Sequence, residues 1–438
     1  MGQEEKRKED ALRQEVSALA EKLAAGLPDG KLKEMFQQCF VSTAATTARF
    51  LPGDRAYVIT GDIEAMWLRD SSAQVAHYLP YIKHSPMLRE LVRGLVLQQM
   101  EFICIDPYAN AFNQEANGRC FEKDETEMSP WIWERKYEVD SLCYPVRLLN
   151  QYWKTTGDDS VFGERTKEAL ITILSVWETQ QRHWECSEYS FVRHDCPASD
   201  TLPNEGKGSP CGYTGMTWSG FRPSDDACEY GYLIPANFFA AGVLGYMADF
   251  ARSIYRDEAL AGRADKLAGE ILEGIRKYGI TQVDGLGPVY AYETDGLGHY
   301  NLMDDANVPS LLSLPWLEAP GVDEEIYRNT RAFVLSKGNP YYYEGTAARG
   351  IGSPHTPSGY IWHIALTMQG LTASDSKERE ELLQTLMDTD AGTGLMHEGF
   401  DADCPEHFTR EWFAWANSLF SLFVIEQQGL GKAVVDAD

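Results

Sequence analysis

A helical hydrophobic period recurs along almost the whole chain, and it constrains the fold more than any other feature. Apolar residues return at spacings of three and four, which places them on one face of a helix. Ser85 and Pro86, before one such run, fit an N-cap and a first-turn position. The runs predict roughly a dozen helices, among them 10–25, 31–47, 75–82, 88–96, 142–153, 170–177, 260–275, 303–314, 324–334, 359–371, 374–387 and 408–427.

Long loops interrupt this helical pattern after every second helix. They are rich in Gly, Pro, Asp, His and aromatic residues, and short strands are expected only around 57–60 and 289–292. Long ordered loops are usually functional. The spacing suits a ring of helix hairpins, a toroid, with the loops gathered at one end; a superhelical array is the alternative, but no fixed repeat is visible. We expect one all-α domain over residues 1–438, with 1–30 as an N-terminal helical extension. The long loops are 106–131, 183–224, 279–302 and 337–358.

The charge of the chain limits its partners. Its 438 residues include 39 Lys and Arg against 66 Asp and Glu, a net charge of −27. Nucleic acid and anionic membranes attract basic surfaces, so neither is an expected partner. The most apolar stretch, 412–425, is too short to span a membrane and contains Asn417 and Ser418. The sequence does not predict the oligomeric state.

The cysteines and the N-terminus indicate the compartment. The nine cysteines form no C-x-x-C pair and are irregularly spaced, which favours free thiols in a reducing compartment. A single Cys186–Cys196 disulfide is the alternative. The N-terminal MGQEEKRKED lacks the apolar stretch of a signal peptide. We therefore expect a cytoplasmic protein.

Polar constellations stand at several expected loop-to-helix junctions. In the segment 61–71, Asp62, Arg69 and Asp70 stand near Trp67. The charged groups can bind sugar hydroxyls while the indole packs against the sugar ring. The alternative is a helix start with capping residues and an ion pair. The run WIWERKYEVD at 131–140 is expected to form a solvated rim. Further polar groups are Asp305 and Asn307 of 298–307, His355 at a turn, Glu398 between His397 and Gly399, and the segment 408–418.

Adjacent carboxylates at Asp225 and Asp226 follow Arg222 at the end of the longest loop. Such neighbours invite perturbed pKa values, although acids at a helix start are also common caps. The string DDACE also has the shape of a magnesium–diphosphate site, but no basic cluster accompanies it. Serine hydrolase, zinc protease, P-loop and dinucleotide motifs are absent, and nothing in the sequence demands a metal or a cofactor.

Paired carboxylates on separate loops suit glycoside hydrolysis. One acid protonates the leaving oxygen, and the other activates water or attacks carbon. Asp225 or Asp226 with Glu398 fits these roles, and we expect burial or a carboxylate neighbour to raise the pKa of the acid. About 6.5–9.5 Å between the carboxyl groups would indicate inversion and about 5–5.5 Å retention. The sequence leaves this separation open.

Five strings resemble glycoside hydrolase family 125 from about residue 40 to about 425. The resemblance implies an (α/α)6 barrel and an exo-acting α-1,6-mannosidase that inverts configuration and needs no metal. Its substrate would be a mannose-containing oligosaccharide or N-glycan fragment. The strings are GDIEAMWLRDS, WERKYEVDSLCYP, YTGMTWSGFRPSDDA, GLGHYNLMDDANVPSLLSLP and MHEGF followed by FTREWFAWANSLF.

The resemblance also implies roles for single residues. Glu398 of MHEGF matches the general base, and the RPSDDA string holds the acid, for which we favour Asp225 over Asp226. Gly399 stands where a serine is expected. Rival functions are another exo-glycosidase on the same toroid, a glycan-binding toroid that would not need both acids, and a magnesium-dependent prenyl-diphosphate enzyme. The expected mannose contacts are Trp67, Arg69 and Asp70, with Asp62, Arg222, Asp305, Asn307 and His355 around them.

Overall fold

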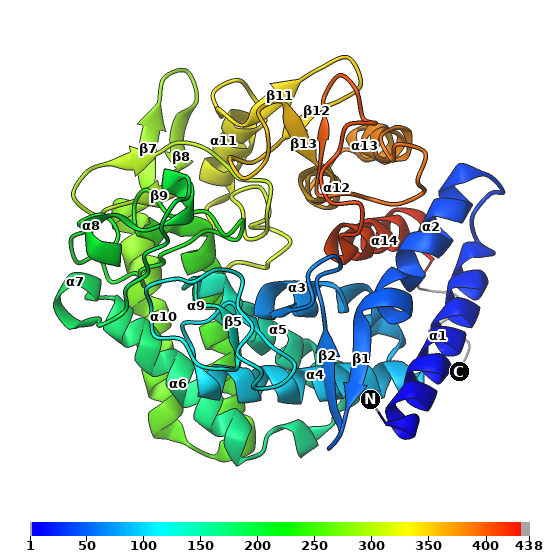
Figure 1. The fold of residues 1–438 in the computed structure, drawn as a ribbon. Coiled ribbons are helices and arrows are strands. Elements are labelled where there is room, and N and C mark those ends of the chain that lie inside the picture. The colour runs from blue at the N-terminus through cyan, green and yellow to red at the C-terminus, as the bar shows by residue number, and fades with distance from the viewer. Residues whose placement is uncertain (1, 431–438) are drawn as a thin grey trace.

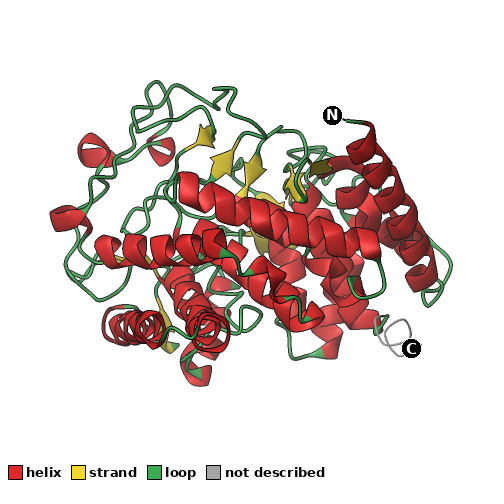
Figure 2. Ribbon diagram, turned by 90° about the horizontal axis from the view of Figure 1, so that it is seen from below, coloured by secondary structure: helices red, strands yellow, loops and turns green. Residues whose placement is uncertain are grey.

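The computed structural model describes residues 2–430. Most of the body is helical, and short strands lie among the loops (Figure 2). The helices are α1 (Gln3–Ala24), α2 (Lys31–Ser42), α3 (Leu68–Ala73), α4 (Pro86–Ile105), α5 (Val139–Thr156), α6 (Glu164–Gln180), α7 (His183–Cys186), α8 (Pro203–Gly206), α9 (Ile234–Phe250), α10 (Glu258–Tyr278), α11 (Glu324–Val334), α12 (His363–Leu371), α13 (Ser376–Asp388) and α14 (Ala414–Gln428).

The strands pair antiparallel in small sheets of two or three, ordered β1-β2, β3-β4-β5, β6-β9-β10, β7-β8, β11-β12 and β13-β14. They are β1 (Ala48–Leu51), β2 (Arg55–Val58), β3 (Met66–Trp67), β4 (Ala111–Phe112), β5 (Ile132–Glu134), β6 (Tyr232–Leu233), β7 (Ile280–Val283), β8 (Gly287–Tyr290), β9 (Glu293–Thr294), β10 (Tyr300–Asn301), β11 (Tyr342–Glu344), β12 (Arg349–Ile351), β13 (Tyr360–Trp362) and β14 (Gly399–Asp401).

The helices pack in two sets. In the first, α3 contacts α5, α5 contacts α9, and α12 contacts α14, which returns to α3. Residues of α9 and α14 are buried almost all round, as expected for helices with neighbours on every side. The second set covers the first: α4 lies on α5 and α6, α10 on α9, α13 on α12, and α2 on α14. Figure 1 shows the chain running around the molecule until α14 lies beside α2.

Several predictions from the sequence are confirmed. The chain is helix-rich, the expected strands correspond to β2 and β8, and Ser85 accepts a hydrogen bond from Leu88 N as the N-cap of α4. The nine cysteines are all free, so no Cys186–Cys196 disulfide forms. No helix between residues 2 and 430 is long and apolar enough to cross a membrane.

The helix predicted over 303–314 is wrong. This segment consists of turns, with Pro309 inside it and Pro315 after it. A proline lacks the N–H that a helix interior needs. The carboxylate of Asp304 instead accepts hydrogen bonds from Leu311 N at 2.8 Å and Leu312 N at 3.0 Å.

Two other helices begin later than the periodicity predicts, because residues before them are extended. The helix predicted from residue 359 begins at His363, after β13. The helix predicted from residue 408 begins at Ala414. The other short sheets were also missed, since strands of two or three residues carry no period of their own.

Two buried asparagines hold loops on the helices that follow them. Asn237, in the first turn of α9, accepts a hydrogen bond from Thr217 N (2.9 Å) and donates to Thr217 O (3.0 Å). Asn417, at the same place in α14, accepts from Met396 N (2.9 Å) and donates to Met396 O (3.2 Å). Each also donates to the carbonyl four residues earlier. The two loops fixed in this way lead to Asp225 and Glu398.

Removing the Asn417 side chain should destabilise the fold and displace the loop before Glu398. Asn417→Ala leaves two buried backbone groups of Met396 without a partner, which should cost about 2–4 kcal/mol in the free energy of unfolding. Ser421→Ala, one turn further along α14, removes only a hydroxyl bonded within the helix and serves as the control. Urea unfolding of both variants measures the difference. Equal midpoints would contradict the proposed anchoring.

Candidate active site

A cavity of about 590 Å³ opens where α3, α5, α12 and α14 begin. The long loops and the short strands before these helices supply its walls. Residues from opposite ends of the sequence therefore meet there. Nine of the predicted site residues line it: Asp62, Trp67, Arg69, Asp70, Asp225, Asp226, Asn307, His355 and Glu398.

The other two predicted contacts lie behind the lining. The Arg222 guanidinium donates through Nε to Glu293 Oε1 at 2.6 Å, and both side chains are buried. Asp305 accepts a hydrogen bond from Ser224 Oγ at 2.9 Å. Both therefore hold the segment that carries the acid pair.

Asp225 stands at the tip of a tight loop. A bridge between Phe221 and Ala227 closes the loop, and Arg222 N donates to Asp226 O at 2.8 Å. The φ of Asp225 is +68°, a left-handed conformation that costs about 1–3 kcal/mol for a residue other than glycine. Lys136 Nζ donates to Asp225 O at 2.7 Å and so holds the strained backbone. The side chain keeps 24% of its surface exposed toward the cavity.

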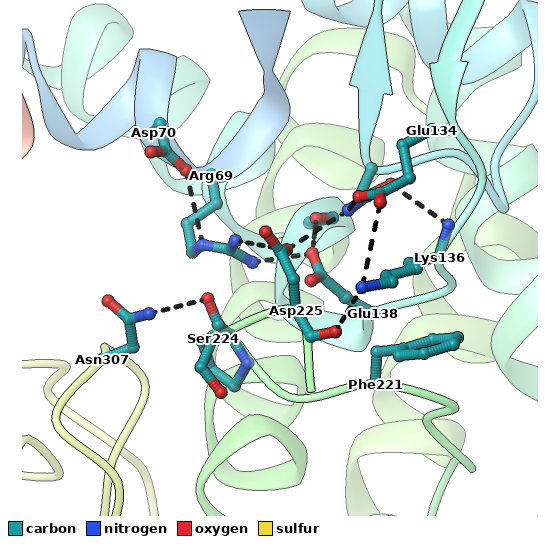
Figure 3. Close-up of polar contacts among 12 residues, drawn as sticks. Arg69, Asp70, Glu134, Lys136, Glu138, Phe221, Ser224, Asp225 and Asn307 are labelled. Atoms are coloured by element: carbon teal, nitrogen blue, oxygen red, sulfur yellow. Dashed lines mark hydrogen bonds and ion pairs between the residues drawn. The ribbon is translucent and has the colours of Figure 1, made fainter. Parts of the chain in front are cut away.

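Arg69 gathers the carboxylates of this wall (Figure 3). Nη1 contacts Glu138 Oε2 at 2.6 Å and Asp140 Oδ2 at 3.1 Å, and Nη2 contacts Asp225 Oδ1 at 3.1 Å. Asp70 Oδ2 lies 3.5 Å from Nε. One buried cation therefore orients acids from α3, from α5 and from the Asp225 loop.

These contacts shift the pKa values in different directions. Burial opposes ionisation of Asp225, but Arg69, a hydrogen bond with Glu138, Lys136 and His355 together hold the pKa of Asp225 below its usual range. Burial, helped by the Asp225 and Asp140 charges, raises the pKa of Glu138 well above its usual value despite Arg69. The direction for Asp225 is opposite to that expected from the sequence, because the sequence did not place Arg69 and Lys136 beside it.

The pKa values of the neighbouring carboxyl groups are raised. Burial raises the pKa of Asp70 to about 6 and that of Asp140 to about 6, in both cases against Arg69. His355 Nδ1 lies 3.7 Å from Asp226 Oδ2. Burial disfavours its charged form, but Asp226 outweighs this and raises the pKa of His355 to about 9. Because 39% of the side chain is exposed, water screens part of this attraction.

Glu398 enters the cavity just before β14. Pairing of β13 with β14 places Trp362 opposite Gly399. A Cβ atom on Gly399 would lie 3.1 Å from the Trp362 ring, so the expected serine would crowd the indole. Arg410 Nη1 lies 3.6 Å from Glu398 Oε1, and the same guanidinium forms a salt bridge with Asp62. Arg410 thus connects the base candidate to a predicted sugar contact.

Aromatic rings complete the lining. Trp67, Trp362, Phe413 and Trp415 line the cavity, and Trp362 Nε1 donates to Thr356 Oγ1 at 2.9 Å. Flat apolar faces of this kind pack against the C–H face of a sugar, while carboxylates and guanidinium groups bind its hydroxyls.

The prediction that 131–140 forms a solvated rim is wrong. Lys136, Glu138 and Asp140 are buried, and they bond to Asp225 or to its partner Arg69. Arg410, Phe413 and Trp415 were named only as part of the segment 408–418, and neither they nor Trp362 were given a role. The available signal was position: each stands directly before or within the first turns of a buried helix, where the other constellations also stand.

A second cavity of about 570 Å³ lies at the opposite ends of α3, α5 and α14. Arg147 lines it, with its Nη1 atom buried and without a hydrogen-bond partner. Its acids, Glu318 and Glu426, do not converge on a cation as those around Arg69 do. The paired acids, the strained aspartate and the aromatic faces occur together in the first cavity.

Known proteins match this chain over most of its length. The model of the family described as metal-independent alpha-mannosidase (GH125) matches residues 29–425. A Schizosaccharomyces pombe protein, "Meiotically up-regulated gene 157 protein", is 37% identical over an alignment of 433 residues, and the match covers 94% of this chain and 85% of that protein.

Solved structures are also similar. A Streptococcus pneumoniae metal-independent alpha mannosidase, solved as a non-productive complex with alpha-1,6-mannobiose, is 46% identical. The match covers 96% of this chain and 98% of that one, with a TM-score of 0.91. A glucoamylase from Saccharomycopsis fibuligera, 13% identical over 97% of each chain with a TM-score of 0.56, shares the fold alone. The chain belongs to glycoside hydrolase family 125, the metal-independent α-mannosidases.

Proposed function

We propose that this α-mannosidase removes non-reducing terminal α-1,6-linked mannose with inversion, with Asp225 as general acid and Glu398 as general base. The observation that carries the proposal is that both carboxylates, far apart in sequence, line one cavity together with several aromatic rings. The related pneumococcal enzyme holds alpha-1,6-mannobiose. A mannose-containing oligosaccharide or N-glycan fragment is therefore the proposed substrate.

The proposed reaction divides the work between the two walls. Asp225 gives a proton to the glycosidic oxygen, which leaves as an alcohol. Glu398 accepts a proton from a water molecule that attacks C1 from the opposite face of the sugar. Asp225 is favoured over Asp226 because it bonds directly to Arg69, whereas Asp226 faces Ser224 and His355. Trp67, Arg69, Asp70 and Asp62 are proposed to bind the mannose, with Asn307 and His355 beside them.

The proposed architecture is an (α/α)6 barrel that forms one domain. Five helices, α3, α5, α9, α12 and α14, are its inner members, and the turn segment 304–319 takes the sixth place. Tyr144 of α5 donates a hydrogen bond to Val308 O, and Tyr327 of α11 donates to Leu312 O, which ties this segment to both layers. The N-terminal helix α1 packs on α2, β1 and α4. A cytoplasmic location stays a prediction from the sequence.

The anomer released first tests the stereochemistry. Proton NMR of the enzyme with α-1,6-mannobiose in the presence of EDTA should show β-mannose before mutarotation mixes the anomers. Early release of α-mannose would support the proposed substrate but refute Glu398 as the residue that activates water. No release, with glucosides cleaved instead, would favour another exo-glycosidase on this fold.

Glu398→Gln should lower kcat on α-1,6-mannobiose by about 10³-fold or more, because an amide cannot accept the proton of water. Mannose binding, measured by calorimetry, should stay within a few-fold of the parent protein, since the side chain keeps its shape. Near-normal turnover would remove Glu398 from its role. If the parent protein itself binds mannose but hydrolyses no mannoside, it would be a glycan-binding module instead.

Asp225→Asn and Asp226→Asn separate the two acid candidates. The variant that lacks the acid should lose mannobiose hydrolysis but keep hydrolysis of α-mannosyl fluoride, whose leaving group needs little protonation. We expect Asp225→Asn to show this pattern. Asp226→Asn should affect both substrates to a similar degree; the reverse result would assign the acid to Asp226.

A further inference from the structure

Glu138 occupies an unusual position behind the proposed acid. Its side chain, at the N-cap of α5, is fully buried and cannot touch a sugar. Oε2 accepts hydrogen bonds from Arg69 Nη1 and Ser141 Oγ, each at 2.6 Å. Oε1 is buried and receives no hydrogen bond from a protein donor. Asp225 binds the neighbouring nitrogen of the same guanidinium, with Oδ1 3.1 Å from Arg69 Nη2, so the two carboxyl groups lie side by side on one arginine (Figure 3).

Two ionised carboxylates in this contact would repel each other strongly. A proton between them removes the repulsion and supplies the missing donor. The surrounding charges do not balance a second anion, because Arg69 already faces Asp70 and Asp140 as well as this pair. The charged groups that face the pair are Arg69 and Asp70 of α3, Lys136 before α5, Asp140 of α5, and His355 of the loop before β13.

We propose that Glu138 is the proton partner of Asp225: the two carboxyl groups hold one proton between them, and Glu138 passes it to Asp225 for catalysis. This inference rests on the proposed role of Asp225 as the general acid. Glu138 itself is a positioning residue, since it acts on the substrate only through Asp225.

The transfer balances within the site. The O–H bond on Glu138 breaks as an O–H bond forms on Asp225, and the negative charge moves to Glu138. Arg69 Nη1 and Ser141 Oγ already stand at hydrogen-bond distance to receive that charge. Asp225 then protonates the glycosidic oxygen. Both carboxyl groups are now anionic, and the pair regains its proton through Asp225, whose side chain faces the cavity.

The partnership also explains how Asp225 can serve as an acid among cations. Arg69, Lys136 and His355 favour its ionised form and lower its pKa. A hydrogen bond from protonated Glu138 lowers it as well. Once Glu138 has lost its proton, however, its negative charge opposes these effects, because loss of the last proton leaves two anions side by side. Without that charge, Asp225 would give up its proton at a lower pH. The basic limb of the activity profile should therefore depend on Glu138.

Glu138→Gln tests the inference, since glutamine keeps the size of the side chain but has neither the negative charge nor a proton acidic enough to pass to Asp225. We expect kcat/KM on α-1,6-mannobiose at pH 7 to fall by about 10²-fold, within the range for general acid catalysis. The basic limb of the pH profile should shift down by about one unit or more. Hydrolysis of α-mannosyl fluoride should change by less than about threefold, because it needs little protonation.

Glu293→Gln is the matched control. Glu293 is also fully buried and also bonded to an arginine, Arg222, at 2.6 Å, but Asp225 is not among its hydrogen-bond partners. Glu293→Gln should change the rates of hydrolysis of mannobiose and of α-mannosyl fluoride by similar factors. It should leave the basic limb of the pH profile in place. Thermal unfolding of both variants shows whether each is folded.

A double-mutant cycle separates this inference from the proposed function. If Glu138 acts through Asp225, Glu138→Gln should cause no further loss of mannobiose hydrolysis in an Asp225→Asn background. An equal loss in both backgrounds, or an equal loss on both substrates, would overturn the partnership and leave Asp225 as the acid. Full mannobiose activity in Asp225→Asn alone would instead refute the proposed function.

Discussion

The buried guanidinium of Arg69 is the contact on which the rest of the site depends. A charge removed from water must be paired. Arg69 is paired with acids from three parts of the chain: Asp70 of its own helix, Glu138 and Asp140 at the start of α5, and Asp225 of the long loop before β6. Each pairing fixes one element relative to the others. Arg69 also lowers the pKa of each of these carboxyl groups, against the effect of burial.

The loops reach this site because the helices behind them hold their backbones. Asn237 and Asn417 stand at equivalent places in two buried helices and bind both backbone groups of a loop residue. Satisfying buried N–H and C=O groups is obligatory, so these amides leave the loops little freedom. Asp225 and Glu398 are carried by the two loops anchored in this way. A rigid helical frame thus supports side chains whose positions must stay fixed during catalysis.

Much of this could be predicted from the sequence. The period of three and four residues predicted most of the helices. The polar strings at loop-to-helix junctions, with the family resemblance that they carry, predicted nine residues that line the cavity. Predictions from the local sequence pattern were wrong where contacts between distant parts of the chain determine the structure. The turns at 304–314 follow from Asp304 and Pro309, and the burial of Glu138 follows from Arg69, some seventy positions away. The pKa direction of Asp225 also required its neighbours, which only the fold brings together.

The most direct test of the account is a crystal structure with a thio-linked α-1,6-mannobiose, which the enzyme cannot cleave. The account predicts that the linking sulfur lies within hydrogen-bond reach of Asp225 and the terminal mannose against Trp67 and Arg69. The Asp225 and Glu398 carboxyl groups should stand about 6.5–9.5 Å apart, with a water between Glu398 and C1. A separation of about 5–5.5 Å, or a mannose bound away from Asp225, would contradict it.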